Sequence, residues 1–224
     1  MRLRSAVTLL TLGASPLVAQ TWPVDEGTFV VAKAGAQSFT ESFKIKHGPG
    51  GLITATGSQT AGSQLTTTSL TTDSLGTPMQ YDLRVTKSGA LALKVHATAT
   101  GPRRFTASST AATGEDGMKE YPLAAGHSVI LEPGLLHQLF FLPLGGRNGR
   151  VEILEPGAAR VSNAVVTLKG LDNIRIGGKS MTANRYSLTG LAAEADFWVD
   201  NQGRLLRVDI PSQGLSATRE EPPR

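Results

Sequence analysis

The chain has no cysteine among its 224 residues, and aromatic residues make up only 5% of it. Without cysteine there can be no disulfide framework, no thiolate nucleophile and no cysteine-ligated metal. Nucleic-acid-binding surfaces combine a basic face with stacking aromatic side chains, so the shortage of aromatics argues against a nucleic-acid partner. No apolar run approaches the roughly 20 residues that a transmembrane helix needs, so we expect no transmembrane span.

The positive charge of the chain is small and dispersed. There are 22 basic and 18 acidic residues, which gives a net charge of +4. Two of the basic residues, Arg2 and Arg4, belong to the N-terminal segment. The densest other basic cluster, R-N-G-R at 147–150, lies in a glycine-rich turn. This distribution gives no basic face for binding nucleic acid.

The N-terminal segment has the pattern of a secretory signal peptide. Two arginines precede an apolar run at 6–12, and Leu17-Val18-Ala19 provides small residues for cleavage after Ala19. We therefore expect a signal peptide at 1–19 and an exported protein, periplasmic or extracellular. The remaining residues, 20–224, show no linker and no internal repeat, so they should form a single domain.

Most of this domain alternates between apolar and polar residues. The alternation is clear at 38–47, 79–85, 91–98 and 206–210. A period of two predicts strands with one face on a core and the other in solvent. Further strands are expected at 28–32, 52–59, 64–72, 103–108, 119–123, 128–132, 150–155, 161–169, 179–188, 193–200 and 214–219. The connections are too short for crossover helices, so the fold class should be all-β: a curved antiparallel sheet, or half-barrel.

One segment breaks the period of two. Between Pro133 and Pro143 the sequence reads G-L-L-H-Q-L-F-F-L, and its apolar residues follow helical spacing. Proline fits the first turn of a helix and stops a helix that reaches it. We expect a short helix of two to three turns near 134–142. Because it is apolar nearly all round, it should be buried against the concave side of the sheet.

Candidate catalytic motifs are weak. Asp73-Ser74-Leu75-Gly76 is similar to the Asp-Thr/Ser-Gly motif of aspartic proteases, but Leu75 separates the serine from the glycine. Aspartic, serine, glycine and proline residues are also the usual turn formers, so a β-turn is the better interpretation. The chain has no Gly-x-Ser-x-Gly elbow and no phosphate-binding loop that follows a strand and opens a helix.

A metal site is not expected either. His127, Glu132 and His137 are spaced five residues apart. In a strand this spacing places side chains on opposite faces, and helical ligand pairs sit four residues apart. We therefore predict neither a metal nor another cofactor, and we favour a protein that is not an enzyme.

His137 and Gln138 interrupt the apolar segment that should be buried. Buried polar side chains need hydrogen-bond partners. These two therefore either tie the helix to the sheet or face a ligand cavity, and the first alternative is the commoner one.

The C-terminal part of the chain carries a resemblance. Within 193–219, an aromatic strand (A-E-A-D-F-W-V-D at 193–200), an Asp-x-x-Gly turn and an L-x-R-V strand resemble the C-terminal part of uncharacterised secreted bacterial domains. V-E-I-L-E-P at 151–156 and G-G-K-S-M-T-A-N-R-Y-S-L at 177–188 fit the same pattern. The architecture of these domains resembles the LolA/LolB lipoprotein-carrier half-barrels. The resemblance implies a curved antiparallel sheet around a helical plug, sometimes with an apolar cavity.

The functional prediction is an exported, non-enzymatic protein that binds an apolar or amphiphilic, lipid-like ligand between the concave face and the helix. Burial of apolar ligand surface would drive such binding without catalytic residues. One alternative is a structural or interaction module that docks an envelope protein through its sheet edges or convex face. Another is a hydrolase, although no nucleophile–base pair can be assembled. The predicted ligand-binding residues are Leu136, His137, Gln138, Phe140, Phe141, Trp198 and Arg207.

Overall fold

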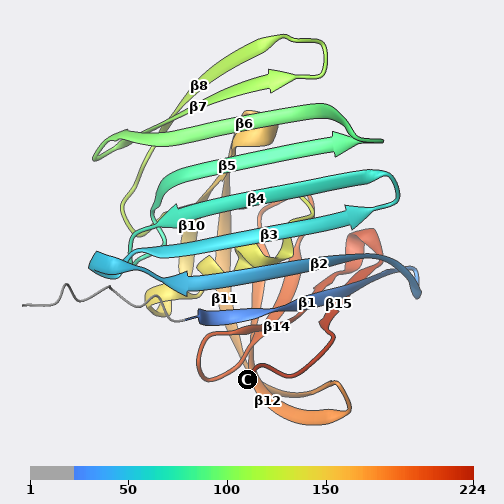
Figure 1. The fold of residues 1–224 in the computed structure, drawn as a ribbon. Coiled ribbons are helices and arrows are strands. Elements are labelled where there is room, and N and C mark those ends of the chain that lie inside the picture. Colours follow the sequence, from blue (N-terminus) through green and yellow to red (C-terminus); the bar gives the residue numbers. More distant parts are fainter. Residues whose placement is uncertain (1–22) are drawn as a thin grey trace, which may run out of the picture.

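The computed structural model describes residues 23–224, so the expected signal peptide at 1–19 lies outside the described residues. The first half of the chain is an antiparallel meander in which each strand pairs with the next (Figure 1). Its strands are β1 (Pro23–Lys33), β2 (Ala36–His47), β3 (Ile53–Ala61), β4 (Gln64–Thr72), β5 (Pro78–Lys87), β6 (Ala90–Gly101), β7 (Arg104–Ala111) and β8 (Asp116–Pro122).

The second half returns to the beginning of the first. Strand β15 pairs with β1, so the strands within residues 23–224 form one open sheet of 15 strands whose outer members are β8 and β9. The strands of this half are β9 (Ser128–Ile130), β10 (Gly149–Glu155), β11 (Arg160–Ile176), β12 (Lys179–Thr189), β13 (Ala195–Val199), β14 (Leu205–Ile210) and β15 (Leu215–Arg219). The all-β prediction is confirmed, and nearly every expected strand is present.

Two details of the predicted sheet need correction. Strands β9 and β10 pair in parallel, so the sheet is mixed rather than wholly antiparallel. The chain between them, residues 131–148, returns to the end of the sheet at which β9 began, so that β10 runs in the same direction as β9, which a short hairpin could not achieve. Strand β11 also continues well beyond residue 169. A β-bulge between Leu168 and Gly170 interrupts its pairing with β12, and beyond the bulge the pairing continues with the side chains turned to the opposite faces of the sheet.

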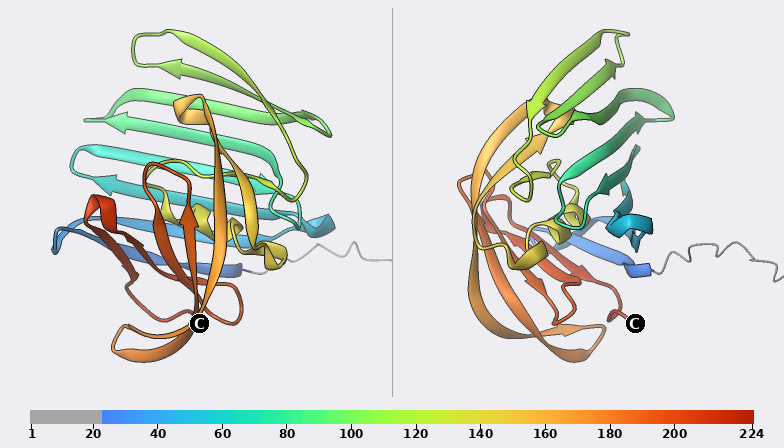
Figure 2. Two further views of the ribbon diagram at one scale, coloured as in Figure 1. Left: turned by 180° about the vertical axis from the view of Figure 1, so that it is seen from behind. Right: turned by 90° about the vertical axis from the view of Figure 1, so that its left-hand side faces the viewer.

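The sheet curves so that its two halves face each other across a shared core. In the right-hand view of Figure 2, the meander β1–β8 and the returning strands form two layers with a short helical segment between them. This segment is the 3₁₀ helix η2 (Leu136–Phe141), which contacts β2 and β3 on one side and β14 on the other. Strands β5 and β9 also meet across the interior. The curved open sheet around a buried helical plug agrees with the prediction.

The predicted short helix near 134–142 is present, as a 3₁₀ helix of six residues at Leu136–Phe141. Gly134 has a φ of +86° and Leu135 is extended, so the helix cannot begin before Leu136. Pro143 follows one residue after Leu142, whose N–H closes the last turn on Leu139. The four remaining 3₁₀ helices are three-residue turns: η1 (Pro49–Gly51), η3 (Leu144–Gly146), η4 (Pro156–Ala158) and η5 (Pro211–Gln213). Within residues 23–224, no helix is both long and apolar enough to cross a membrane.

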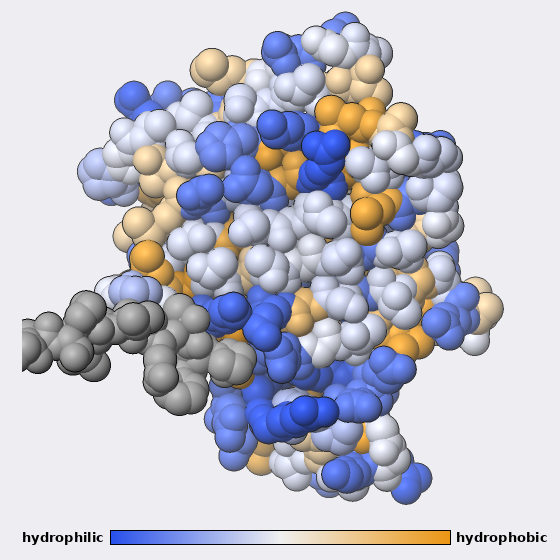
Figure 3. All heavy atoms as spheres, in the orientation of Figure 1, coloured by the Kyte–Doolittle hydropathy of each residue, from blue (hydrophilic) through white to orange (hydrophobic). Residues whose placement is uncertain are grey.

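The outer face of β1–β8 is polar, as the alternation requires. Strand β3 buries Ile53 and Ala55 while Thr54 and Thr56 face outward. Figure 3 shows this face mostly in blue and white, with only scattered apolar atoms. The segment Asp73-Ser74-Leu75-Gly76 also lies outside the core and forms a turn. The Oδ1 atom of Asp73 accepts the N–H groups of Leu75 and Thr77 at 2.9 and 2.8 Å.

Candidate functional site

A buried carboxylate on β2 fixes the start of η2. Glu41 is fully buried, and its Oε2 accepts the N–H of Leu136 at 2.9 Å. Its Oε1 accepts the N–H of His137 at 2.8 Å and lies 2.7 Å from His137 Nδ1. The first amides of a helix have no partner within the helix, so the carboxylate caps η2 from strand β2. The other ring nitrogen, Nε2, lies 3.3 Å from Thr68 Oγ1 on β4.

The sheet leaves a space for the imidazole ring at Gly57. Phe43, Gly57 and Thr68 stand next to one another on β2, β3 and β4. A Cβ added to Gly57 would lie no more than 2.9 Å from three atoms of the His137 ring. Phe43 stacks beside the same ring at a centroid distance of 6.5 Å. The histidine therefore occupies a position that a glycine keeps open.

Gly57→Ala should destabilise the protein by about 1–3 kcal/mol, because the new methyl group overlaps a ring that two hydrogen-bonding partners, Glu41 and Thr68, hold in place. Gly101→Ala is the matched control, since nothing lies within 4 Å of the Cβ that this change adds. Urea denaturation of both variants measures the difference. If Gly57→Ala is as stable as Gly101→Ala, the inference that the His137 ring packs closely against Gly57 is wrong.

Gln138 also binds protein groups. Its Oε1 accepts the N–H of Glu132 at 2.6 Å, and nearby Gln59 donates to the carbonyl of Gly134 at 2.7 Å. In this structure both polar residues of the buried segment tie it to its surroundings. Neither His137 nor Gln138 lines the large apolar cavity beside η2.

This cavity lies between η2 and the returning half of the sheet. Its volume is about 400 Å³, within the range of small-molecule sites. Leucines from the η2 segment form one wall, and residues from the end of β12, the following loop and β14 form the other. The apolar lining includes Leu135, Leu136, Leu139, Leu188, Leu191 and Ile210.

The polar lining residues form a group of their own. Arg160 donates to Glu155 at 3.0 Å, and Ser162 donates to the same carboxylate at 3.5 Å. Glu132 accepts the N–H of Gly157 at 2.6 Å. Burial raises the pKa of Glu132 to about 7, against the lowering effect of the Gly157 hydrogen bond. The cavity thus combines an apolar body with one carboxylate-rich end.

The structure separates the predicted ligand-binding residues into three places. Leu136 lines the cavity. Phe140 and Phe141 pack edge to face in the core at 5.4 Å, outside the cavity lining. Trp198 lies on the outer face of β13, in a small cluster with Ile174, Ile176, Ala183 and Leu206. Arg207 stacks on its ring at 5.1 Å.

Alternation along β13 explains this separation. Ala195 and Phe197 face inward and belong to the main core, and Ala195 lines the cavity. Trp198 follows Phe197 directly, so it points to the other face. Sequence reasoning identified Glu132 only as a weak metal candidate and missed Glu155, Arg160 and Leu188 at the cavity. Glu155, Arg160 and Ser162 are close in sequence, but the tertiary fold brings Glu132 to them and places Leu188 at the same cavity.

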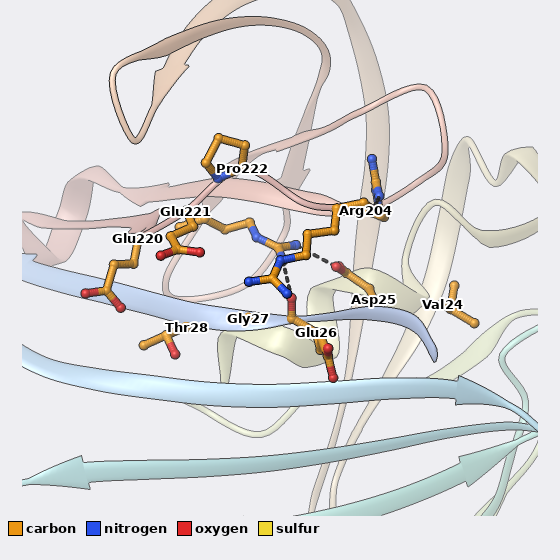
Figure 4. A pocket seen from close by; sticks show the side chains of 11 residues that line it. Val24, Asp25, Glu26, Gly27, Thr28, Arg204, Glu220, Glu221 and Pro222 are labelled. Carbon is orange, nitrogen blue, oxygen red and sulfur yellow. Dashed lines mark hydrogen bonds and ion pairs between the residues drawn. The ribbon is translucent and has the colours of Figure 1, made fainter. Parts of the chain in front are cut away.

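A second, smaller cavity of about 300 Å³ is strongly charged (Figure 4). It lies where β1 meets the C-terminal tail. Arg219 donates to Asp25 Oδ1 at 2.6 Å and also binds the carbonyl of Glu26. Gly27 leaves room for the guanidinium, since an added Cβ would overlap it. Both members of the ion pair are almost fully buried, which indicates a role in joining the two ends of the domain.

Comparisons with known proteins are sparse. No family model matches the chain, and no curated protein matches it at a significant level. The crystal structure of a DUF1089 family protein from Pseudomonas aeruginosa aligns over 94% of this chain and 98% of its own, with 19% identity and a TM-score of 0.39. A similarity of this size assigns no function, and no link to the LolA/LolB carriers is shown.

Proposed function

We propose that this protein is an exported carrier or binding protein for an apolar or amphiphilic ligand, and that its architecture follows the LolA/LolB type. The observation that carries the proposal is the apolar cavity of about 400 Å³ between η2 and strands β12–β14. Leu135, Leu136, Leu139 and Leu188 on its walls belong to the hydrophobic core, whereas other lining residues, such as Pro133 and Arg160, are exposed. Apolar cavities with a few polar groups at one end are typical of ligand sites.

The lining is suited to a flexible hydrocarbon group. Leu135, Leu136 and Leu139 project from one side, and Leu188 and Leu191 from the other. Burial of about 200 Å² of apolar ligand surface would contribute about 5 kcal/mol, from which the cost of ordering the ligand is subtracted. This corresponds to reversible binding, as a carrier or sensor requires.

Filling the cavity tests this proposal. Ala193 lines the cavity and is partly exposed, so Ala193→Phe should reduce the ligand volume while the core stays intact. Titration with N-phenyl-1-naphthylamine, a neutral apolar fluorophore, should give saturable binding to the wild type and at least tenfold weaker binding to the variant. Ala112→Phe, the same change at an exposed position on the β7–β8 connection, should bind the probe like the wild type.

Absence of probe binding by the wild type would refute the proposal. Native mass spectrometry of protein purified from its own host supplies an independent test, because a carrier should retain part of its ligand.

An envelope interaction module is the second candidate, and strand β8 is the observation that favours it. Strand β8 pairs only with β7 among the described residues, and its residues 116–120 are all exposed. Met118 is 81% exposed. An edge of this kind can accept a strand from another protein. This candidate becomes the better one if the cavity binds no apolar probe.

A further inference from the structure

We propose that the cavity selects cationic amphiphiles, with the ammonium group of the ligand against the Glu132 carboxylate and its alkyl chain among the leucines. This inference rests on the proposed function, since it specifies the class of ligand for the same cavity. Three features of the polar end support it: a carboxylate oxygen without a protein donor, an adjacent ion pair, and the absence of any cation other than the paired Arg160 among the described residues of the lining.

The first feature is the hydrogen bonding of Glu132. The residue lines the cavity and is only 6% exposed. Its Oε1 accepts the Gly157 N–H at 2.6 Å, whereas Oε2 accepts no hydrogen bond from the residues that the structure describes. The side chain as a whole is largely shielded from water, which disfavours its charge, while Oε2 keeps some solvent access and has no protein donor. A ligand that brings a positive N–H donor would supply the missing partner.

The second feature is the charge balance next to Glu132. The Glu155 side chain is 4% exposed and pairs with Arg160, whose side chain is 56% exposed. Arg160 thus neutralises Glu155 and makes two contacts with it, through Nε and Nη2. Among the described residues that line the cavity, Arg160 is the one cation. The charge of Arg160 also reaches Glu132, but the like charge of Glu155 acts on Glu132 more strongly, so a carboxylate ligand would meet repulsion there and an ammonium ligand attraction.

The remaining groups around Glu132 carry no charge that would reverse this preference. Tyr81 on β5 and Tyr121 on β8 both interact with Glu132. Burial raises the pKa of Tyr81 well above its usual range and that of Tyr121 to about 12, so both phenols stay neutral. Lys119 is directed elsewhere, over the Tyr121 ring and onto the carbonyl of Ala159.

A pH dependence follows from these contacts. The pKa of Glu132 is about 7 because burial disfavours its charged form. A cationic ligand binds the ionised carboxylate and therefore displaces a proton at lower pH. The ionised fraction rises about tenfold between pH 6 and pH 8, while an alkylamine stays protonated over this range. Affinity for an alkylamine should rise by the same factor.

Three ligands that share one alkyl chain length separate the contribution of the headgroup to affinity from that of the chain. Decylamine, decanol and decanoate are titrated against bound N-phenyl-1-naphthylamine at pH 6 and pH 8. For the wild type we expect decylamine to bind at least tenfold more tightly than decanoate at pH 8, with a tenfold gain from pH 6 to pH 8. Decanol should show no dependence on pH.

Glu132→Gln is the test variant. It keeps the shape and the Gly157 hydrogen bond while it removes the charge, so it should lose both the preference for decylamine and the pH dependence. Glu115→Gln, at an exposed loop position, should behave as the wild type. Thermal melting checks that both variants fold, and removal of an uncompensated buried charge should not lower stability.

The outcomes are distinct. If the three ligands compete equally and Glu132→Gln changes nothing, or if decanoate binds best, the cation selectivity is refuted while amphiphile binding stands. If neither the probe nor any of the ligands binds, the proposed function fails and the selectivity fails with it. If Glu132→Gln does not fold, the wild-type comparison of ligands and pH still decides.

Discussion

Glu41→Ala is expected to lower the free energy of unfolding by about 3–5 kcal/mol. Glu41 is the single acceptor for the N–H groups of Leu136 and His137 and for the imidazole Nδ1. All of these donors are buried, so removal of the carboxylate leaves them unsatisfied in the core. The change also detaches η2 from β2, and with it one wall of the cavity. Urea denaturation gives the loss of stability, and probe titration should show weaker binding.

Glu26→Ala is the matched control. Glu26 lies on neighbouring β1 and pairs with Lys44 at 2.5 Å, but the side chains are 55% and 44% exposed. Exposed ion pairs contribute little, so this change should cost less than about 1 kcal/mol. Equal losses for the two variants would show that Glu41 does not anchor η2.

Arg219→Leu should have an effect of similar size, also about 3–5 kcal/mol. The guanidinium joins Asp25 on β1 to the carbonyl of Leu205 at the start of β14, and it packs over the Phe43 ring at 5.2 Å. Without it, Asp25 remains buried and unpaired. Arg207→Leu is the control, because the Arg207 side chain is 39% exposed and its pairing with Asp209 lies at the surface.

The pH dependence of the Arg219 variant gives a second readout. Burial already raises the pKa of Asp25, and loss of Arg219 removes the main opposing charge. A carboxyl with a raised folded-state pKa binds its proton more tightly when folded, so the folded state gains stability as pH falls. The deficit of Arg219→Leu relative to wild type should therefore shrink on acidification. A deficit that is constant or grows toward low pH would contradict this account of the ion pair.

The strands of this protein could be predicted from the sequence because side-chain alternation is local. In β3, for example, Ile53 and Ala55 alternate with threonines whatever strand lies beside them. The buried plug could be predicted for the same reason, since an apolar segment between two prolines has to be covered. Its 3₁₀ geometry could not, because the left-handed Gly134 and the capping carboxylate set where the helix begins.

The contacts that define the site were decided by the tertiary structure alone. Glu41 and His137 stand 96 residues apart, and nothing in either local sequence indicates that they meet. From the sequence, Gly57 could be recognised only as a glycine in a strand, not as the residue against which the His137 ring packs. Leu188 and Leu136 become opposite walls of one cavity because β15 returns to β1 and brings the second half of the sheet over the first. Alternation tells which face of a strand is buried, whereas strand order and curvature determine what that face meets.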